Sequence, residues 1–542
     1  MRAKISLALS ILCFLNLATI NANAQDEINR VLQFNDTNQL TYDRNLISKL
    51  TTTKLGANTI STTYTPCTTS DLKDKCEPFS NDLSIINVIG PCLENSKVPC
   101  IENVWRSDLN GNWVRGEYKG SRMPLSKNDT IWTSDYLPGI DIPRNSNMYQ
   151  FPGLPHDNGT LFEIDPVIKG ISDHGSPISY SDLHIQVKAI YQTDKTDAKT
   201  RNECLGNFDP CWVASNTDVS WNIKISLQLP TAPFGWVTGR LIDTSMEVSK
   251  NSNPNLPVVF TISGRPTLTP SLIRDFRRDN SSDFEDWNKI ANVFNLPWDN
   301  ISKAPVLGPN SLSKFVQVIK LLPSLDKSTS EHVAWNVDLN WDKNSPQNRQ
   351  LQMCATKDII GYAGSNSLTF LDSVPSFDPK SSTIRYTVAS PHFESNGSLA
   401  TGQYQLQLNL GVAKCLWKIS SVPLKAEINV TSADGEKKLI TSTMKVSGNF
   451  LNFYVSGYGY SESTISIGLP VDEALPMPSP STSETKSTDL KNKPEVIPSI
   501  SKLPISTQVN TMTQKTITCF KGKLTKKVTG VKPACPAGYK QK

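Results

Sequence analysis

The feature that most constrains the fold is an alternation of apolar and polar residues over Val219–Leu229. Odd-numbered positions from 221 to 229 carry Trp, Ile or Leu, whereas the positions between them carry Asn, Lys, Ser or Gln. Successive side chains of a strand point to opposite faces, so the pattern predicts a strand with one buried and one solvated face. A similar pattern fills Val333–Trp341, at an offset of 333 − 219 = 114 residues, about the length of one β-sandwich domain.

These two stretches predict the fold class. Further alternating runs are bounded by the turn signals Asn396-Gly397 and Asp434-Gly435, which favour hairpins. Short strands separated by such turns at about ten-residue spacing are typical of an antiparallel sandwich or barrel. We therefore expect an all-β protein with tandem antiparallel β-sandwich-like domains, a short helical connector and a disordered C-terminal spacer.

One segment departs from the strand pattern. Ser282 and Glu285 match a capping box, and Leu296-Pro297 ends the pattern, so a helix is expected over 283–295. The segment Phe315–Leu321 fits either a strand or a helix. The apolar residues that recur at helical spacing are Phe284, Trp287, Ala291 and Phe294.

The composition changes after Pro470. Residues 471–514 hold six prolines and no aromatic residue, so this segment cannot bury enough apolar surface to offset its ordering entropy. The expected organisation is a signal peptide at 1–24, a loop-rich Cys-containing N-terminal segment at 25–98, a first β domain at 99–270, a connector with one helix at 271–330, a second β domain at 331–470, a Pro/Ser/Thr-rich linker at 471–514 and a basic two-Cys tail at 515–542.

The N-terminus predicts export. Arg2 and Lys4 precede the apolar run Ile5–Leu17, which is too short for a membrane span, and Ala22-Asn23-Ala24 matches a cleavage signal. No later stretch is long and apolar enough to cross a bilayer. We expect a secreted protein, extracellular or cell-wall associated, that begins at Gln25 and has no transmembrane span.

The cysteines agree with an oxidising compartment. Ten remain once Cys13 of the signal peptide is removed, and most of them lie in close pairs along the chain. They predict five disulfides, although the sequence alone does not fix which cysteines are joined. The ten are Cys67 and Cys76, Cys92 and Cys100, Cys204 and Cys211, Cys519 and Cys535, and the distant Cys354 and Cys415.

The net charge of +5 conceals an asymmetry between the body and the tail. Removal of Arg2 and Lys4 leaves 5 − 2 = +3. Residues 515–542 contain eight Lys and no acid, so residues 25–514 carry 3 − 8 = −5. Nucleic-acid binding is not expected, because a nucleic-acid-binding domain carries its positive charge on a folded face. The Lys-rich tail could instead hold anionic cell-wall polymers.

The chain contains no common catalytic signature. The nucleophile elbow G-x-S-x-G, the zinc motif H-E-x-x-H, the P-loop and the glycine-rich dinucleotide loop are all missing, so no cofactor is expected. Asp108–Asn112 begins like a calcium loop, but Trp113 and Lys119 occupy the positions that need Gly and Glu. A hairpin turn is the favoured interpretation.

Histidines are the scarcest polar residues, and three of the five lie within 29 positions. A His/Asp metal site is conceivable if their loops converge. The favoured alternative is that these are loop histidines beside solvated acids. The candidate metal ligands are His156, His174, His184, Asp157 and Asp173.

The eleven tryptophans suggest a carbohydrate ligand, because aromatic rings stack on the apolar faces of sugars. The candidates near turns are Trp105, Trp113, Trp132 and Trp298, with core or rim packing as the favoured alternative. Trp236 and Arg240 share one side of a predicted strand, where they form either a binding patch or a stacked Arg–Trp pair.

The tail Thr516–Lys540 resembles the tails of many uncharacterised secreted proteins of Gram-positive bacteria. Pro99–Asn103, Phe234–Leu241 and Tyr386–Phe393, with Cys415-Leu416-Trp417, resemble parts of the bodies of such proteins. The resemblance implies export and a β-rich architecture, and it implies no activity.

The order of signal peptide, β domains, spacer and basic tail favours a secreted, non-enzymatic protein of the cell surface or envelope that binds or adheres. The alternative is an extracellular carbohydrate-active enzyme or a carbohydrate-binding module. An enzyme of the hydrolase class would need paired carboxylates or a bound metal in an aromatic-lined groove.

Overall fold

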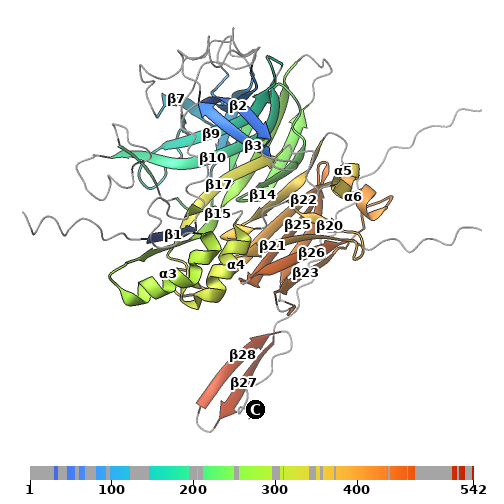
Figure 1. Ribbon diagram of the computed structural model, residues 1–542. Helices are drawn as coiled ribbons and strands as arrows, with labels where there is room; N and C mark the ends of the chain where they lie inside the picture. Colours follow the sequence, from blue (N-terminus) through green and yellow to red (C-terminus); the bar gives the residue numbers. More distant parts are fainter. Residues whose placement is uncertain are drawn as a thin grey trace, which may run out of the picture. The chain divides into compact units, whose positions relative to one another are not determined.

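The structure is a computed structural model (Figure 1), and the chain divides into two compact units, Met1–Glu473 and Ala474–Lys542. The described residues are 30–34, 46–54, 60–66, 81–92, 98–122, 146–176, 178–193, 204, 211–215, 217–249, 256–295, 306–308, 311–340, 349–354, 358–370, 374–423, 425–433, 435–437, 440–460, 462–469, 515–521, 524–530 and 540–541.

The first unit is all-β with large antiparallel sheets, as the alternation predicts. The two stretches that predicted the fold are strands β12 (Ile223–Leu229) and β17 (Ser330–Asn340). Their apolar positions are buried, from Trp221 to Leu229 in one stretch and from Trp335 to Leu339 in the other. Both sets belong to the same hydrophobic core, however, so they do not mark two separate domains.

A central sheet runs through the unit, and each neighbouring pair of its strands is antiparallel except β13–β18, which is parallel. In spatial order its strands are β9 (Leu161–Ser172), β10 (Ser179–Thr193), β17, β13 (Gly235–Gly239), β18 (Ile359–Ser365), β22 (Thr401–Asn409), β25 (Phe450–Gly459) and β24 (Thr441–Ser447).

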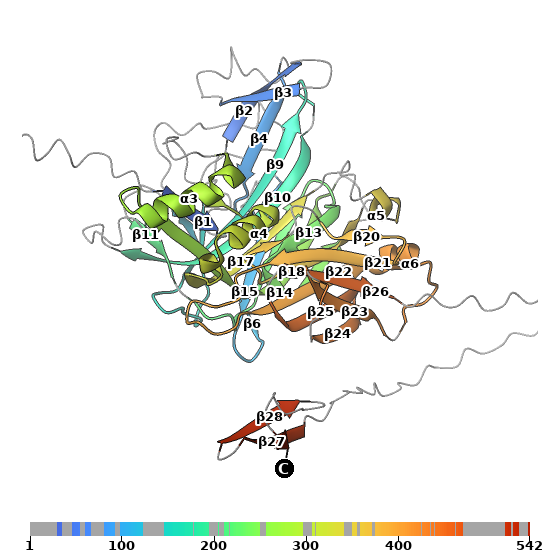
Figure 2. The ribbon, with the colours of Figure 1, turned by 60° about the horizontal axis from the view of Figure 1, so that its bottom comes forward.

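Two layers of strands cover the central sheet: the first is continuous with it through one strand pairing, and the second is a separate five-stranded sheet. The first cover sheet encloses a core with β9, β10, β17 and β13, and the second encloses another core with β18, β22 and β25 (Figure 2). The first cover sheet comprises β6 (Trp113–Arg115), β5 (Cys100–Ser107), β12, β15 (Val258–Phe276) and β14 (Leu241–Ser249). The second comprises β19 (Thr369–Phe370), β20 (Ser376–Asp378), β21 (Thr383–Ala389), β26 (Ser463–Gly468) and β23 (Glu427–Ser432).

The two covers lie on opposite faces of the central sheet. Neighbouring residues of a strand point to opposite faces, and in β13 Trp236 enters the second core whereas Val237 enters the first. All seven residues of β18 are buried, because both of its faces are covered. The domain boundaries expected at 270 and 331 are therefore wrong: β15 continues to Phe276, and β17 pairs with β10, β13 and β15.

The expected connector contains two helices, α3 (Ser281–Phe294) and α4 (Leu312–Leu321), which lie side by side in Figure 1. The first confirms the predicted helix, but its N-cap is Asn280, whose side chain accepts from the backbone N–H of Ser282 and Asp283. The predicted capping box at Ser282 is wrong by two residues. The helices pack on β1 (Arg30–Phe34) and the end of β15 in a third core, next to the 3-10 turn Pro323–Leu325.

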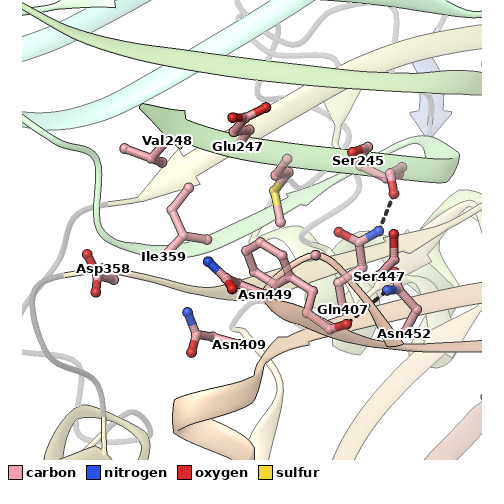
Figure 3. Close-up of a pocket in the computed structure, with 14 residues that line it drawn as sticks. Ser245, Glu247, Val248, Asp358, Ile359, Gln407, Asn409, Ser447, Asn449 and Asn452 are labelled. Carbon is pink, nitrogen blue, oxygen red and sulfur yellow. Dashed lines mark hydrogen bonds between the residues drawn. The ribbon is translucent and has the colours of Figure 1, made fainter. Parts of the chain in front are cut away.

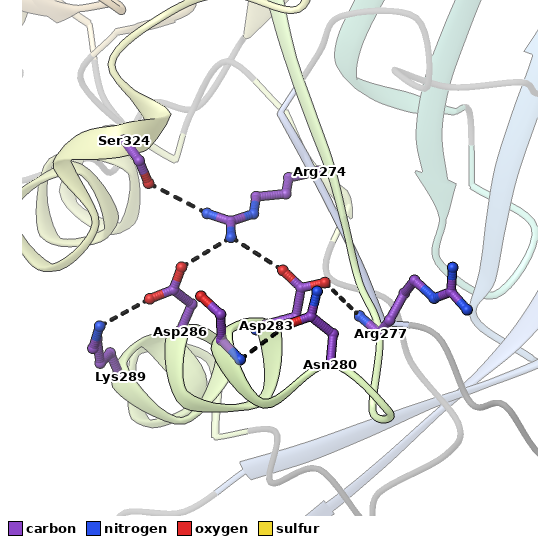
Figure 4. A network of polar contacts seen from close by, with 8 residues as sticks. Arg274, Arg277, Asn280, Asp283, Asp286, Lys289 and Ser324 are labelled. Carbon is purple, nitrogen blue, oxygen red and sulfur yellow. Dashed lines mark hydrogen bonds and ion pairs between the residues drawn. The ribbon is translucent and has the colours of Figure 1, made fainter.

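Arg274 on β15 holds this helical layer (Figure 4). Its guanidinium donates to Asp283 at 3.2 Å and to Asp286 at 2.9 Å, both on α3, and to the Ser324 hydroxyl at 3.3 Å. Asp286 also accepts from Lys289 at 2.8 Å. Hydrogen bonds from Lys289 and then from Arg274 keep the pKa of Asp286 below its ordinary value of 3.8.

The N-terminal segment 25–98, expected to be loop-rich, supplies several strands. β1 pairs with β15 and with the short β16 (Val306–Leu307), and β4 extends the central sheet beyond β9. Short alternating runs gain stability by adding to an existing sheet edge, which their own sequence does not reveal. The strands that extend the central sheet are β2 (Leu46–Lys54), β3 (Ile60–Pro66), β4 (Leu83–Val88), β7 (Glu117–Ser121), β8 (Asn147–Gln150) and β11 (Cys211–Ala214).

Three of the expected disulfides are present: Cys92–Cys100, Cys204–Cys211 and Cys354–Cys415. The last joins helices α5 (Arg349–Cys354) and α6 (Leu410–Trp417). Of the other cysteines, Cys67, Cys76 and Cys535 lie outside the described residues, and only the backbone of Cys519 is described.

The second unit contains a three-stranded antiparallel sheet in the expected basic tail. Its strands are β27 (Lys515–Lys521), β28 (Leu524–Gly530) and β29 (Lys540–Gln541). The expected disordered linker at 471–514 lies outside the described residues. Within the described part of the chain, no helix is both long and apolar enough to cross a membrane.

The shared sheet makes a first prediction. Residues 331–470 produced alone should not fold, because β18 loses its partner β13 and one face of the sheet loses its cover. Circular dichroism and the dispersion of the amide NMR spectrum measure this, with residues 25–470 as the folded control. A cooperative thermal unfolding transition in the isolated 331–470 fragment would contradict it.

A second prediction concerns Arg274. Arg274→Ala should lower the free energy of unfolding by about 2 kcal/mol, the scale for losing hydrogen bonds to charged groups. The contribution of Asp286 is present at neutral pH and should be lost as the pH falls below 3.8, because its pKa is lowered in the folded state.

Urea titrations at pH 7 and pH 3 test both statements. The matched control is Arg277→Ala, whose exposed ion pair with Asp279 should contribute about 0–1 kcal/mol. Equal losses for the two variants at pH 7 would show that Arg274 does not hold the helical layer.

Candidate functional site

The first cover sheet ends before the central sheet does, and a cavity lies at this step between the layers. β14 is the edge of the first cover sheet, and beyond it the strands β22, β25 and β24 continue the central sheet. Alternate residues of these strands, such as Leu406 and Leu451, enter the second core. The residues between them therefore face β14, and they are largely polar, with Gln405, Gln407 and Asn452 among them.

This cavity, here called the amide cavity, has a volume of about 560 Å³. Figure 3 shows the β14 residues along one wall, with Asn409, Asn449 and Asn452 on the facing wall. The lining residues are Thr244–Val248, Asp358, Ile359, Gln407, Asn409, Ser447–Phe450 and Asn452.

Gln407 is the most constrained polar group of the lining. Its side chain is only 2% exposed, and its amide nitrogen donates to the Thr244 carbonyl. Its carbonyl oxygen Oε1 is buried and has no hydrogen-bond partner among the described residues. An unpaired buried acceptor costs about 1–3 kcal/mol, so a ligand that donates a hydrogen bond there would recover this energy.

The rim of the cavity combines polar and apolar groups. The turn between β24 and β25 presents Asn449, which is exposed, and Gly448, whose φ of 55° suits glycine. The Asn449 carbonyl accepts from the N–H of Leu410 at 2.9 Å, which ties this turn to α6. Phe450 and Met246 add apolar surface.

The lining can bind but offers few catalytic groups. It contains no imidazole, thiol or basic side chain, and its two carboxylates are Glu247 on β14 and Asp358 before β18. Amides and hydroxyls supply hydrogen-bond donors and acceptors together. Such a surface suits a neutral ligand that carries many hydroxyl groups.

A smaller cavity of about 280 Å³ lies farther along the same step. Its lining includes Tyr454, Tyr460 and Glu331. Glu331 accepts from the N–H and the hydroxyl of Ser395, so this carboxylate is already engaged within the protein. Beside the amide cavity, β14 is joined to β22 by two hydrogen bonds, from the Thr244 N–H to Gln405 and from the Gln407 amide to the Thr244 carbonyl.

The five candidate metal ligands do not all converge. His156 is held by Leu161 and Ser215, and its neighbour Asp157 is exposed. His184 is buried and lies 2.7 Å from Asp338, its cross-strand partner.

His174 and Asp173 do meet, and Asp82 joins them. His174 Nδ1 lies 2.7 Å from Asp173 and 2.9 Å from Asp82. Among the described residues these three form the one group with atoms close enough for a shared ion. They lie at an exposed turn, and the ligand atoms of His156, His184 and Asp157 are not part of this group, so the five candidates do not share one site.

The predicted aromatic candidates separate into two groups. Trp105 and Trp113 come together at the surface of the first cover sheet, each with its ring centroid 4.5 Å from Lys224 Nζ. Trp132 and Trp298 lie outside the described residues.

Trp236 and Arg240 belong to the interior, at 1% and 0% exposure, so they form no surface patch. Arg240 follows the end of β13 and donates to the carbonyls of Ser365 and Leu368 at 2.9 and 3.1 Å. Its guanidinium lies over Phe370, 4.9 Å from the ring centroid. A buried guanidinium needs several acceptors, and backbone carbonyls supply them here.

The expected hairpin at Asp108–Asn112 is confirmed. Asp108 accepts from the backbone N–H of Asn110 and Asn112, at 2.9 and 2.7 Å, and from the Asn112 side chain at 3.0 Å. These bonds, with the Asn112 side chain first, lower the pKa of Asp108. The carboxylate therefore stabilises the turn between β5 and β6 (Trp113–Arg115).

Sequence reasoning missed the amide cavity. The alternation over Tyr404–Leu410 places Gln405, Gln407 and Asn409 on one side of a strand, which was the available signal. Nothing in the sequence indicated that β14 lies over that side of the strand. Thr244 on β14 and its hydrogen-bond partner Gln405 are 161 residues apart.

Comparisons of the chain with protein-family models, with curated proteins and with solved structures found no match. The chemistry of the surfaces described above is therefore what bears on function.

A third prediction separates two of the candidate histidines. His156 Nε2 donates to Leu161 O at 3.0 Å, and burial lowers its pKa below the ordinary value of 6.5. Hydrogen bonding to Asp173, with Asp82 nearby, raises the pKa of His174. NMR titration should find the two histidines on opposite sides of 6.5.

The lowered pKa of His156 also has a consequence for stability. The unfolded chain takes up this proton first, so stability should fall as the pH drops from 6.5 through the folded pKa of His156. His156→Gln should remove that slope, and His174→Gln should leave it in place. An unchanged slope in His156→Gln would contradict the assignment.

Proposed function

We propose that this is a secreted, non-enzymatic glycan-binding protein of the cell surface or envelope, with the amide cavity as a binding site. The observation that carries the proposal is the buried, unpartnered oxygen of Gln407 in a cavity lined by four side-chain amides. Its volume of about 560 Å³ suits a short stretch of a sugar chain.

The lining favours sugars over other small ligands. A sugar hydroxyl both donates and accepts, so it can satisfy Gln407 Oε1 and accept from a neighbouring amide. An apolar ligand would leave that oxygen unpaired, at a cost of about 1–3 kcal/mol. The Phe450 ring on the rim offers a surface for the apolar face of a sugar ring.

Extracellular location is part of the proposal. The signal-peptide pattern at 1–24 and three disulfides fit an oxidising compartment. The Lys-rich tail, resembling tails of secreted Gram-positive proteins, would add an electrostatic hold on anionic wall polymers.

The second candidate is a carbohydrate-active enzyme. Glu247 and Asp358 line the same cavity, and glycoside hydrolysis uses two carboxylates flanking the scissile bond. Released reducing ends that disappear in both Glu247→Gln and Asp358→Asn would favour this candidate over binding alone.

A fourth prediction tests the cavity. Asn449→Ala and Phe450→Ala in the mature chain should each weaken binding of an oligosaccharide found by glycan-array screening by about tenfold, the scale of one lost hydrogen bond or ring contact. Isothermal titration calorimetry measures the affinities, and thermal unfolding verifies the fold.

The matched control is Asn429→Ala on β23, in the second cover sheet on the opposite face. Its affinity should equal that of the unaltered protein. Native affinity in both cavity variants would remove the amide cavity from the proposed function.

A further inference from the structure

The outer face of the first cover sheet carries a second set of groups that the amide cavity does not use. Ile223, Ile225 and Val104 point into the first core, so their neighbours Lys224 and Trp105 point outward. Lys224 lies directly opposite Trp105 on β5, and Trp105 lies opposite Arg115 on β6. Trp113 is two residues from Arg115 and shares its face.

These four residues, here called the Trp–Lys platform, place one cation between two aromatic rings. Lys224 Nζ is 4.5 Å from the ring centroid of Trp105 and 4.5 Å from that of Trp113. Trp113 is 39% exposed and Arg115 is exposed. The hairpin that carries Trp113 is fixed by the Asp108 hydrogen bonds, so the rings are held in place before any ligand arrives.

The platform has a net positive charge. No carboxylate of the described residues forms an ion pair with Lys224 or Arg115. Three acids close to these residues in the chain have other partners: Glu102 accepts from Gln228, Asp108 accepts from Asn112, and Glu117 pairs with Lys119. A cation with no counter-ion among the described residues, framed by aromatic faces, can recognise an anion attached to a ring-shaped apolar surface.

We propose that the Trp–Lys platform binds an acidic polysaccharide, in which a sugar ring stacks on Trp113 and its anionic substituent pairs with Lys224 and Arg115. A neutral sugar would leave the cation unpaired, and a simple anion would leave the indole faces unused. This site is independent of the amide cavity, which has neutral amides in place of cations.

The experiment uses the mature chain, residues 25–542, and affinity electrophoresis in gels that contain one polymer each. Polygalacturonate carries carboxylates, dextran sulfate carries sulfates, dextran is neutral, and polyglutamate is an acidic polypeptide. Lys224→Met keeps the side-chain stem and removes the charge, Trp113→Ala removes a ring, and Lys224→Arg restores the cation. Lys314→Met, on the exposed face of α4, is the matched control.

We expect Lys224→Met and Trp113→Ala each to weaken binding to polygalacturonate, to dextran sulfate or to both by about tenfold, equivalent to about 1.4 kcal/mol. Lys224→Arg should keep most of the binding affinity of the unaltered protein, and Lys314→Met should keep all of it. Which acidic polymer is affected identifies carboxylate or sulfate as the preferred group.

Three results would overturn the proposal. Equal binding by Lys224→Met and the unaltered protein to both acidic polymers would assign all retention to the Lys-rich tail. An equal loss with polyglutamate would assign the platform to acidic polypeptides. If Lys224→Met weakened binding to the acidic polymers and Trp113→Ala did not, the binding would be explained by non-specific charge attraction. Loss of oligosaccharide binding in Asn449→Ala, measured in parallel, reports on the cavity alone.

Discussion

The parallel pair β13–β18 is buried on both faces, and the rest of the first unit is arranged around it. Trp236 and Val237 enter different cores, so each cover sheet depends on this pair. The close approach needs glycine: a Cβ on Gly361 would lie 2.0 Å from the Gln407 carbonyl and 2.8 Å from the Trp236 ring. Arg240, at the end of β13, then fixes the turn after β18 through backbone carbonyls.

The offset between the two covers explains where a ligand can enter. Each cover protects only part of the central sheet, and the first cover ends at β14. The strands that emerge beyond this edge must still present one set of side chains to the second core. Their other set faces a partly open step, which is why amides line a cavity there.

The outer face of the first cover sheet follows from the same alternation of neighbouring side chains between the two faces of a sheet. Because Ile223 and Ile225 are committed to the interior, Lys224 is committed to the surface beside Trp105. The positions of both surfaces thus follow from which side chains are buried. The platform lies on the solvated face of the first cover sheet, and the amide cavity lies at the edge of that cover. The two surfaces differ in chemistry, because the platform is cationic with indole rings and the cavity is lined by neutral amides.

The sequence by itself determined the local features. The alternation at 219–229, the α3 helix, the Asp108 turn and the close cysteine pairs Cys92–Cys100 and Cys204–Cys211 needed only short-range patterns. Tertiary structure alone decided that the two alternating stretches share one core, that Trp236 is buried while Trp113 is exposed, and that β14 covers Gln407. The physical reason is that periodicity states which side of a strand a residue occupies, whereas what lies over that side depends on pairing between distant strands.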